Sequence, residues 1–319
     1  MRRVRSLMVV LVALSAVSAW GAPAVILFPS IGTTTSVTVA GRVLKDAPSP
    51  GTSAMSRNLR RLSASNWEGA PVEVRFAGLS ASVVSVSDGA FSVTFSGPKP
   101  FPVGVQYAEA YVRGARLAVA TVDVGAPAAP YFVISDFDDT IAVSNVVSNR
   151  GLLNTALMHD GTTHPPVEGM NRWYRCMRNV GFARPVFALV SGSPQQFTGR
   201  IGAFLQKHGM PPFGLYLRDL GPSTLSDYKQ PVIRKLLEAV PYPVVLVGDS
   251  GEHDPEVYAQ IRKEYPDRVK AIYIHDVGRA EDAARFEGMV LFKEPKDAAA
   301  DSVTRGLAQA TCVDAWEAP

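Results

Sequence analysis

Acidic side chains follow two apolar segments that have the length and composition of buried strands. They are Asp136, Asp138 and Asp139 after Tyr131–Ser135, and Asp249 and Asp254 after Val244–Val247. Crowded carboxylates repel each other, and a protein keeps them when a cation or a proton relieves the repulsion. Because no cysteine and no paired histidine accompanies them, these hard oxygen ligands predict Mg²⁺ rather than zinc. The candidate metal ligands are Asp136, Asp138, Asp249 and Asp254.

Two serines and a lysine complete a set of groups suited to phosphoryl transfer. Ser191 and Ser193 follow a third apolar segment, and Lys229 lies at the start of an expected helix. In such a set Asp136 would attack phosphorus, with Mg²⁺ screening the approach of two anions, and Asp138 would act as general acid and base. Ser191 and Lys229 would bind the phosphoryl oxygens, where charge develops. Ser193 is a further candidate contact to the substrate.

The elements that must position these groups differ between two parts of the chain. From about residue 24 to 124, short alternating runs of β-branched and aromatic residues are separated by Gly, Pro and Ser, which predicts an antiparallel β-sandwich. Residues 46–66 interrupt this pattern, and we expect a long exposed loop there.

Beyond the Gly- and Pro-rich segment 125–130, continuous apolar runs alternate with helical stretches. This pattern predicts a parallel sheet that is covered by helices on both faces. The expected strands are 131–135, 186–190, 244–247, 269–274 and 289–292. Ligands of such folds bind at the carboxyl ends of the strands, so the acids, serines and lysine should meet there.

The N-terminus is predicted to be a signal peptide over residues 1–22. The basic residues 2–5 precede an apolar run over 7–20, which is short for a membrane span and typical of a secretory signal. The remainder would be exported, to the periplasm or out of the cell, with an uncleaved N-terminal anchor as the alternative. Export permits a disulfide between Cys176 and Cys312, while two buried thiols are the other interpretation.

Composition and charge exclude several classes of protein. With 47% hydrophobic and 19% charged residues among 319, the chain is not mostly disordered. Three of its 32 Lys and Arg residues lie in the leader, and the other 29 balance the 29 Asp and Glu residues. A neutral mature chain has no positive field to gather nucleic acid, so we expect no nucleic-acid partner.

Four segments stand in an order known from one phosphatase family. They are Ser135–Ile141, Pro165–Gly169, Val190–Pro194 and Leu246–Tyr258. Over about residues 131–280 the chain resembles the actin-patch-associated phosphatidate phosphatase family, which belongs to the haloacid-dehalogenase-like phosphatase superfamily. The resemblance implies a Rossmann-like parallel sheet of the haloacid-dehalogenase type. It also implies Mg²⁺-dependent removal of phosphate from phosphatidate, a phospholipid, to give diacylglycerol.

The expected organisation is therefore a signal peptide at 1–22, a β-sandwich domain at 23–127 and a phosphatase domain at 128–319. Within the phosphatase domain, residues 141–182 form an insertion that covers the active site in members of the superfamily. Arg172 and Arg175 in this insertion could contact an anionic headgroup, or could lie on the solvated face of an amphipathic helix. His275, which stands where the members tend to carry Arg, is a further candidate contact to the substrate.

Three functions remain open at this point. The first is a phosphatase of phosphatidate or a related phospholipid, and the second is a phosphatase of soluble phosphomonoesters in the periplasm. The third is a non-catalytic binding or adhesion protein with a structural divalent-cation site, although a Ca²⁺ loop would concentrate the acids in one segment. For the lipid substrate, Arg57, Arg60 and Arg61 could make a peripheral contact with an anionic membrane.

Overall fold

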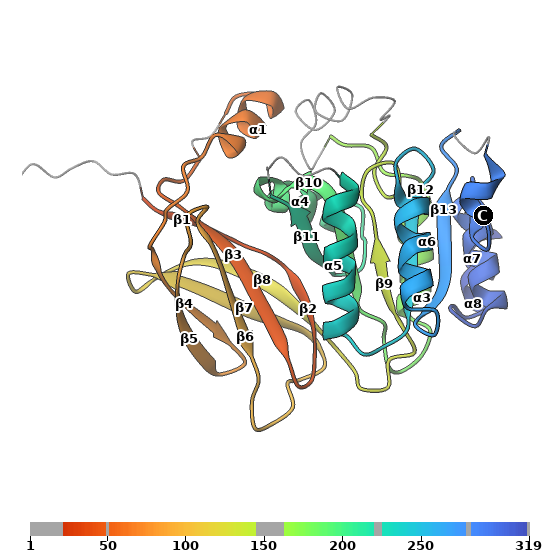
Figure 1. Cartoon of the computed structure of the whole chain (residues 1–319), viewed down its shortest axis with the longest axis horizontal. Coiled ribbons are helices and arrows are strands. Elements are labelled where there is room, and N and C mark those ends of the chain that lie inside the picture. The colour runs from red at the N-terminus through yellow and green to blue at the C-terminus, as the bar shows by residue number, and fades with distance from the viewer. Residues whose placement is uncertain (1–21, 49–50, 145–162, 220–224, 279–281, 318–319) are drawn as a thin grey trace, which may run out of the picture.

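A computed structural model describes residues 22–48, 51–144, 163–219, 225–278 and 282–317. The predicted leader lies outside these residues, apart from Ala22. Two sheets stand side by side, one built from the N-terminal strands and one surrounded by the helices of the second half (Figure 1). Among the described residues, no helix combines the length and the hydropathy that crossing a membrane requires.

The first sheet contains eight strands. They are β1 (Ala24–Leu27), β2 (Ser30–Thr33), β3 (Val37–Leu44), β4 (Pro71–Phe76), β5 (Leu79–Val84), β6 (Ala90–Phe95), β7 (Gly104–Val112) and β8 (Ala115–Gly125). Every pairing is antiparallel except that of β2 with β8. The antiparallel pairing expected of a β-sandwich is therefore confirmed, with one parallel pair added, and the eight strands are joined in a single sheet.

This sheet folds over a core of its own. Strand β3 pairs with β6 along one edge, whereas the path from β2 through β8, β7 and β4 leads to β5. Phe76 of β4 packs against Phe95 of β6, with ring centroids 6.0 Å apart. In β4 the alternate residues Val72 and Val74 are also buried, because successive side chains of a strand point to opposite faces.

A helix interrupts the segment that was predicted to be a loop. Helix α1 (Ala54–Leu62) begins after Ser53, whose hydroxyl accepts a hydrogen bond from the Ser56 amide while the Ser56 side chain caps the Ser53 amide. The prediction for 46–66 was wrong there: Met55, Leu59 and Leu62 have helical spacing, but the helix is short, polar residues outnumber apolar ones in it, and Met55 and Leu59 are exposed. Its start is fixed by capping groups instead.

The second sheet contains six strands in the order β11-β10-β9-β12-β13-β14, and all of them are parallel. They are β9 (Phe132–Ser135), β10 (Phe187–Pro194), β11 (Phe213–Arg218), β12 (Val244–Asp249), β13 (Val269–His275) and β14 (Val290–Phe292). The expected parallel sheet is confirmed. Sequence reasoning missed β11, a short apolar run that begins only three residues after Met210.

Helices cover both faces of the parallel sheet. They are α3 (Met170–Arg178), α4 (Thr198–Lys207), α5 (Leu225–Ala239), α6 (Asp254–Glu264), α7 (Pro295–Thr304) and α8 (Thr311–Glu317), with short 3₁₀ turns η1 (Gln195–Phe197) and η2 (Ala283–Phe286). Val133 of β9 packs with α3, α4 and α7, while Phe132 and Ile134 pack with α5 and α6. Burial on both faces explains why these strands are apolar throughout.

The antiparallel sheet covers the outer edge of the parallel one. The Leu215 amide of β11 donates to the Pro29 carbonyl at 2.7 Å, just before β2. A Cβ on Gly214 would lie 2.8 Å from the Ile31 nitrogen, so the backbones approach as closely as glycine permits. The partly buried Arg178 guanidinium also donates to both carboxylate oxygens of Asp123, at 2.5 and 3.0 Å. These contacts satisfy a strand edge that would otherwise be open to pairing.

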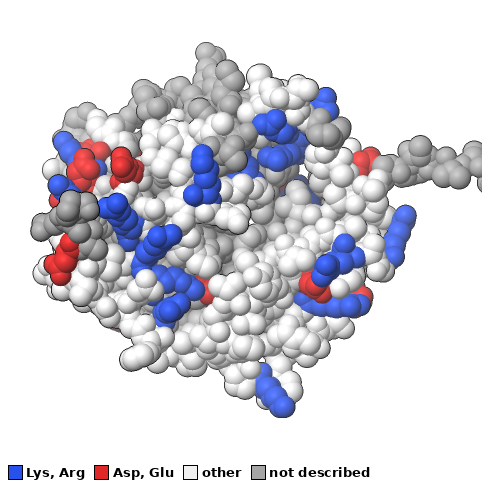
Figure 2. Space-filling view, turned by 180° about the vertical axis from the view of Figure 1, so that it is seen from behind, with Lys and Arg blue, Asp and Glu red and all other residues white. Residues whose placement is uncertain are grey.

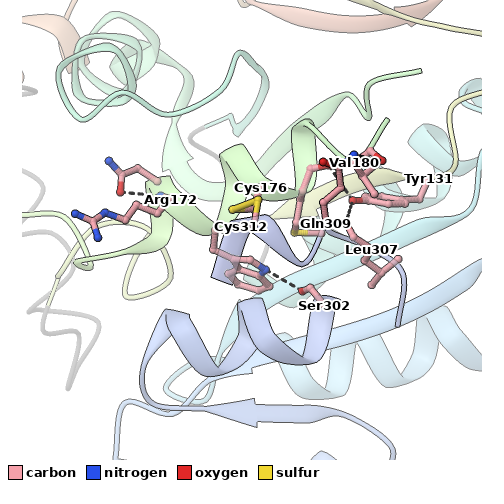
Figure 3. Close-up of a disulfide and its surroundings, with 11 residues drawn as sticks. Tyr131, Arg172, Cys176, Val180, Ser302, Leu307, Gln309 and Cys312 are labelled. Carbon is pink, nitrogen blue, oxygen red and sulfur yellow. Dashed lines mark hydrogen bonds between the residues drawn. A yellow bond between two sulfur atoms is a disulfide. The ribbon is translucent and has the colours of Figure 1, made fainter. Parts of the chain in front are cut away.

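Cys176 and Cys312 form a disulfide, which decides between the two interpretations of the cysteines. The bond joins α3 to α8, and their Cα atoms are 5.5 Å apart (Figure 3). Nearby, the Trp173 indole donates to Ser302 Oγ at 2.9 Å, and the Tyr131 hydroxyl donates to the Leu307 carbonyl. The C-terminal helices are thus attached to the core by covalent and polar contacts.

Candidate active site

The predicted acids meet because their strands are neighbours with matched register. Ser135, the last residue of β9, lies opposite Val247 of β12 and opposite Leu189 of β10. Asp136 therefore begins the segment beyond β9, while Asp249 and Ser191 each come two residues after the matched position. As parallel strands end at the same edge of the sheet, all three side chains reach one region.

Three carboxylates, two of them buried and one partly buried, form a compact group in that region. Asp136, Asp249 and Glu252 each offer an oxygen, and these oxygens lie within 4.8 Å of one another. Sequence reasoning missed Glu252. Its backbone amide and that of Gly251 donate to Asp249 Oδ1, at 3.1 and 2.6 Å, so the chain turns back after Asp249 and brings Glu252 with it. The available signal in the sequence was Gly251, a residue that favours turns and lies between the acids Asp249 and Glu252.

The group fits a divalent cation. Asp136 Oδ2 and Asp249 Oδ2 are both buried, and neither has a hydrogen-bond partner in the described part of the chain. Burial, and then the charge of Asp254, raises the pKa of Asp249 well above its ordinary value. Burial also raises the pKa of Asp136, although the charge of Lys229 opposes this. An oxygen-only set with excess negative charge is the kind that hard divalent ions occupy.

Lys229 is buried between the acids. Its ammonium lies 3.0 Å from Asp136 Oδ1, 2.5 Å from Asp254 Oδ1 and 3.4 Å from Glu252 Oε2. Burial opposes its charge, but the surrounding carboxylates outweigh that effect and raise the pKa of Lys229 well above its usual value. The lysine is therefore a fixed positive charge beside Asp136.

Asp254 holds the lysine rather than joining the three clustered carboxylates. One of its oxygens contacts Lys229, and the other accepts the Asp249 amide at 3.3 Å. A Cβ at Gly248 would come within 2.8 Å of the Asp254 carboxylate carbon, so glycine is required there. Asp254 therefore lies against the lysine, and the three carboxylates whose oxygens cluster are Asp136, Asp249 and Glu252.

Asp138 lies beside the group, with two serine hydroxyls on its carboxylate. Ser144 donates to one oxygen at 2.6 Å and Ser193 donates to the other at 3.1 Å. Burial raises the pKa of Asp138, and the two hydroxyls oppose that rise. The Ser193 amide in turn donates to Ser191 Oγ at 3.1 Å. Asp138, Ser191 and Ser193 are therefore brought together, as predicted, whereas Ser144 was not foreseen.

The turn after Asp138 depends on an unusual backbone conformation. Asp139 has a φ of 54°, in the left-handed region, and its side chain accepts the Ser144 amide at 2.7 Å. Its carbonyl lies 2.6 Å from His275 Nδ1. His275 thus lies at the end of β13 against the acidic turn, near the site but in contact with backbone.

Arg172 and Arg175 are not brought to the acidic group. Arg172 lines a separate hollow of about 420 Å³ that also includes Glu168, His208 and Lys296. Arg175 Nε donates to the Gly209 carbonyl at 2.7 Å. Both lie on the outer side of α3, whose inner side buries Trp173 and Tyr174, so the amphipathic-helix interpretation accounts for their positions.

Comparison with known proteins shows that the region carrying this site is similar to one family of catalytic domains. Residues 131–276 match the family model described as the catalytic domain of phosphatidate phosphatase APP1. An uncharacterized protein of Schizosaccharomyces pombe is 31% identical over 154 residues, which are 46% of this chain and 25% of that protein. Phosphatidate phosphatase APP1 of Saccharomyces cerevisiae is 30% identical over 156 residues, which are 46% of this chain and 26% of that protein.

These matches are partial in length. The matched stretch spans about a quarter of the curated relatives, 25% and 26% of their lengths. Among solved structures, the Pnkp1/Rnl/Hen1 complex matches with a TM-score of 0.36 and 17% identity over 48% of each chain, a likeness too slight to support an argument. The matched residues include all three clustered carboxylates, Asp138 and Lys229. Residues 131–276 of this chain are thus similar to the catalytic domain of phosphatidate phosphatase APP1.

Proposed function

We propose that this protein is an exported, Mg²⁺-dependent phosphatase of the haloacid-dehalogenase type that forms an aspartyl-phosphate intermediate. The proposed substrate is phosphatidate or a related phospholipid, and the lipid product is diacylglycerol. The observation that carries the proposal is the group of Asp136, Asp249 and Glu252, in which two buried oxygens have no hydrogen-bond partner among the described residues and Lys229 lies alongside. A fixed cation and an open cation site beside one carboxylate suit an anionic phosphoryl group.

Asp136 is the proposed nucleophile. A carboxylate oxygen of Asp136 forms a bond to phosphorus while the bond from phosphorus to the lipid oxygen breaks. Mg²⁺ held by Asp136, Asp249 and Glu252 would supply positive charge that offsets the repulsion between carboxylate and phosphate. Lys229 and Ser191 bind the phosphoryl oxygens, on which charge is spread in the transition state.

Asp138 is the proposed general acid and base. In the first step it donates its proton to the leaving lipid oxygen. In the second step it takes a proton from water, whose oxygen attacks phosphorus as the bond to Asp136 breaks, and inorganic phosphate is released. The hydroxyls of Ser144 and Ser193 hold both oxygens of its carboxylate in place for these transfers.

The substrate proposal is supported by the yeast relative, which is named as a phosphatidate phosphatase. The face opposite α5 and α6 offers a surface on which a lipid aggregate could lie, since Lys and Arg gather over its middle and upper part while Asp and Glu lie mostly toward its sides (Figure 2). We infer that this face makes a peripheral membrane contact, through attraction to anionic lipid.

Export is supported by the disulfide between Cys176 and Cys312, because such bonds persist in oxidising compartments. Intact mass of the protein recovered from the exported fraction tests this. The expected mature chain lacks about the first 22 residues. A full-length mass would instead support the N-terminal anchor.

One assay tests the function. The purified chain with Mg²⁺ is given phosphatidate in mixed micelles, and glycerol 3-phosphate as the same phosphomonoester without acyl chains. We expect inorganic phosphate from phosphatidate at a clearly higher kcat/KM than from glycerol 3-phosphate. The reverse preference would support the soluble-ester alternative. No phosphate from either substrate at saturating Mg²⁺ would overturn the proposal.

A further inference from the structure

Arg285 makes four contacts to the segment that carries the candidate metal ligands. It belongs to η2, far along the chain from that segment. One terminal nitrogen donates to the Ser250 carbonyl at 3.2 Å, and the other donates to the Glu252 carbonyl at 2.9 Å. Its remaining donors reach both carboxylate oxygens of Glu256, at 2.5 and 3.1 Å. A planar guanidinium presents five N–H donors in a rigid fork, whereas an ammonium is a compact charge on a flexible stem.

The loop 250–252, which contains these carbonyls, also positions the candidate metal ligands. Its amides at Gly251 and Glu252 donate to Asp249 Oδ1, which leaves Asp249 Oδ2 free of hydrogen bonds in the described residues. The loop thus directs its amides toward Asp249, while carbonyls at Ser250 and Glu252 are held by Arg285. Glu252, the member of the group nearest to solvent, is positioned by the same loop.

Glu256 connects Arg285 to the helix that follows the loop. It lies in the first turn of α6, the helix that begins with Asp254. Arg285 therefore connects the loop, the helix start and η2 in one hydrogen-bonded unit. Since Asp254 also contacts Lys229, a movement of the helix start would disturb the lysine as well.

We propose that Arg285 is a positioning residue for the divalent-cation site: it fixes the loop 250–252 so that Asp249 and Glu252 converge. The inference rests on one part of the proposed function, the binding of a divalent cation by the three clustered carboxylates. It does not depend on the substrate. Residues that orient metal ligands by hydrogen bonds typically change metal affinity or activity by about 10–100-fold when they are replaced.

Arg262 provides a matched control. It lies on α6 and also clamps two backbone carbonyls, those of Gly288 and Glu287, both at 2.7 Å. These contacts have the same chemistry as those of Arg285 and hold the two residues that follow η2, but they do not reach the loop 250–252 itself. A general loss of packing would weaken metal binding in both the Arg285 and the Arg262 variants. Loss of loop positioning should weaken it only in the Arg285 variant.

The test measures binding of Mn²⁺ to the full chain without substrate, by titration calorimetry or by the electron paramagnetic resonance of free Mn²⁺. We expect Arg285→Ala to weaken binding by about 10–100-fold and Arg262→Ala to change it less than about twofold. Arg285→Lys keeps the charge and loses the fork, so its affinity should lie between those of Arg285→Ala and the unmodified chain. In turnover assays the Mg²⁺ concentration for half activity should rise in parallel, with kcat at saturating Mg²⁺ within about threefold, because the ligands themselves remain.

Each outcome has a defined meaning. Unchanged Mn²⁺ affinity in both Arg285 variants, or equal weakening in Arg262→Ala, would overturn the positioning role. If the unmodified chain binds Mn²⁺ but releases no phosphate, the proposed function fails while the role of Arg285 is still measured. If the unmodified chain does not bind Mn²⁺, both proposals fail.

Discussion

The two sheets treat charged side chains in opposite ways. On the outer face of the antiparallel sheet, Arg75 pairs with Glu73 at 2.7 Å, and both side chains are well exposed. At the carboxyl edge of the parallel sheet, Lys229 pairs with Asp136 at 3.0 Å, and both are almost fully buried. Water screens the first pair, and such pairs contribute little. The second pair must be compensated by its neighbours, because an unpaired charge at that depth is costly.

This difference arises because the two sheets are covered by other elements to different extents. One face of the antiparallel strands meets solvent, so its polar residues need no partners. The parallel strands are covered on both faces by helices, and their ends are enclosed by the loops that come after them. The same residue types therefore form a chemical site in one region and a solvated surface in the other.

The largest expected effect comes from the nucleophile. Asp136→Asn should lower phosphate release from phosphatidate by roughly 10⁴-fold or more, because an amide cannot form the acyl phosphate. Glu73→Gln, the control in the antiparallel sheet, should keep full activity. Substantial turnover by a folded Asp136→Asn protein would refute the covalent mechanism.

Replacing the basic residue of each ion pair should change the stability of the chain in one region and not in the other. Lys229→Met leaves Asp136 and Asp254 without their common partner, and we expect a loss of about 3–5 kcal/mol in the free energy of unfolding without metal. Arg75→Met should be indistinguishable from the unmodified chain in the same urea titration. Equal midpoints for the two variants would contradict the contrast between buried and exposed pairs.

Reduction of the disulfide should affect the helix-covered region alone, since both cysteines lie there. The bond closes a loop of 136 residues, and loop entropy predicts a stabilisation of about 4–5 kcal/mol. Adding reductant should therefore lower the urea midpoint of a probe in that region. The double variant Cys176→Ser, Cys312→Ser should start from the lower midpoint and should not respond to reductant. A response in the double variant would show that the reductant acts by another route.

The smallest expected effect is a pH dependence of metal-free stability. The pKa values of Asp136 and Asp249 are raised in the folded chain, so these groups keep their protons at pH values where the unfolded chain has released them. The folded form then binds more protons, and its stability falls as pH rises above about 4. Because a metal binds the deprotonated acids, Mg²⁺ should raise the thermal midpoint more at about pH 8 than at about pH 5.5. An equal gain at both pH values would contradict the raised pKa values.

Much of the fold can be predicted from local pattern. Alternating runs before residue 125 and continuous apolar runs after it were enough to predict an antiparallel and a parallel sheet. Strand β11 escaped because Phe213–Arg218 lies close behind a helix and contains Gly214, and its outer edge is contacted by the segment just before β2. Helix α1 escaped because it has only nine residues and polar residues outnumber apolar ones in it, although Met55, Leu59 and Leu62 follow helical spacing.

The candidate site was likewise predictable only in part. Asp136 and Asp249 were predictable because they lie at the carboxyl ends of strands, and neighbouring parallel strands bring the residues at those ends to one edge of the sheet. The position of Glu252 depends on the turn at Gly251, and that of Asp254 on the location of Lys229. The sequence alone determined which chemical groups were available and which strands carried them. Only the tertiary structure decided which carboxylate faces the cation site, which holds the lysine and where Arg172 and Arg175 point, because turns and helix faces are oriented by packing between distant segments.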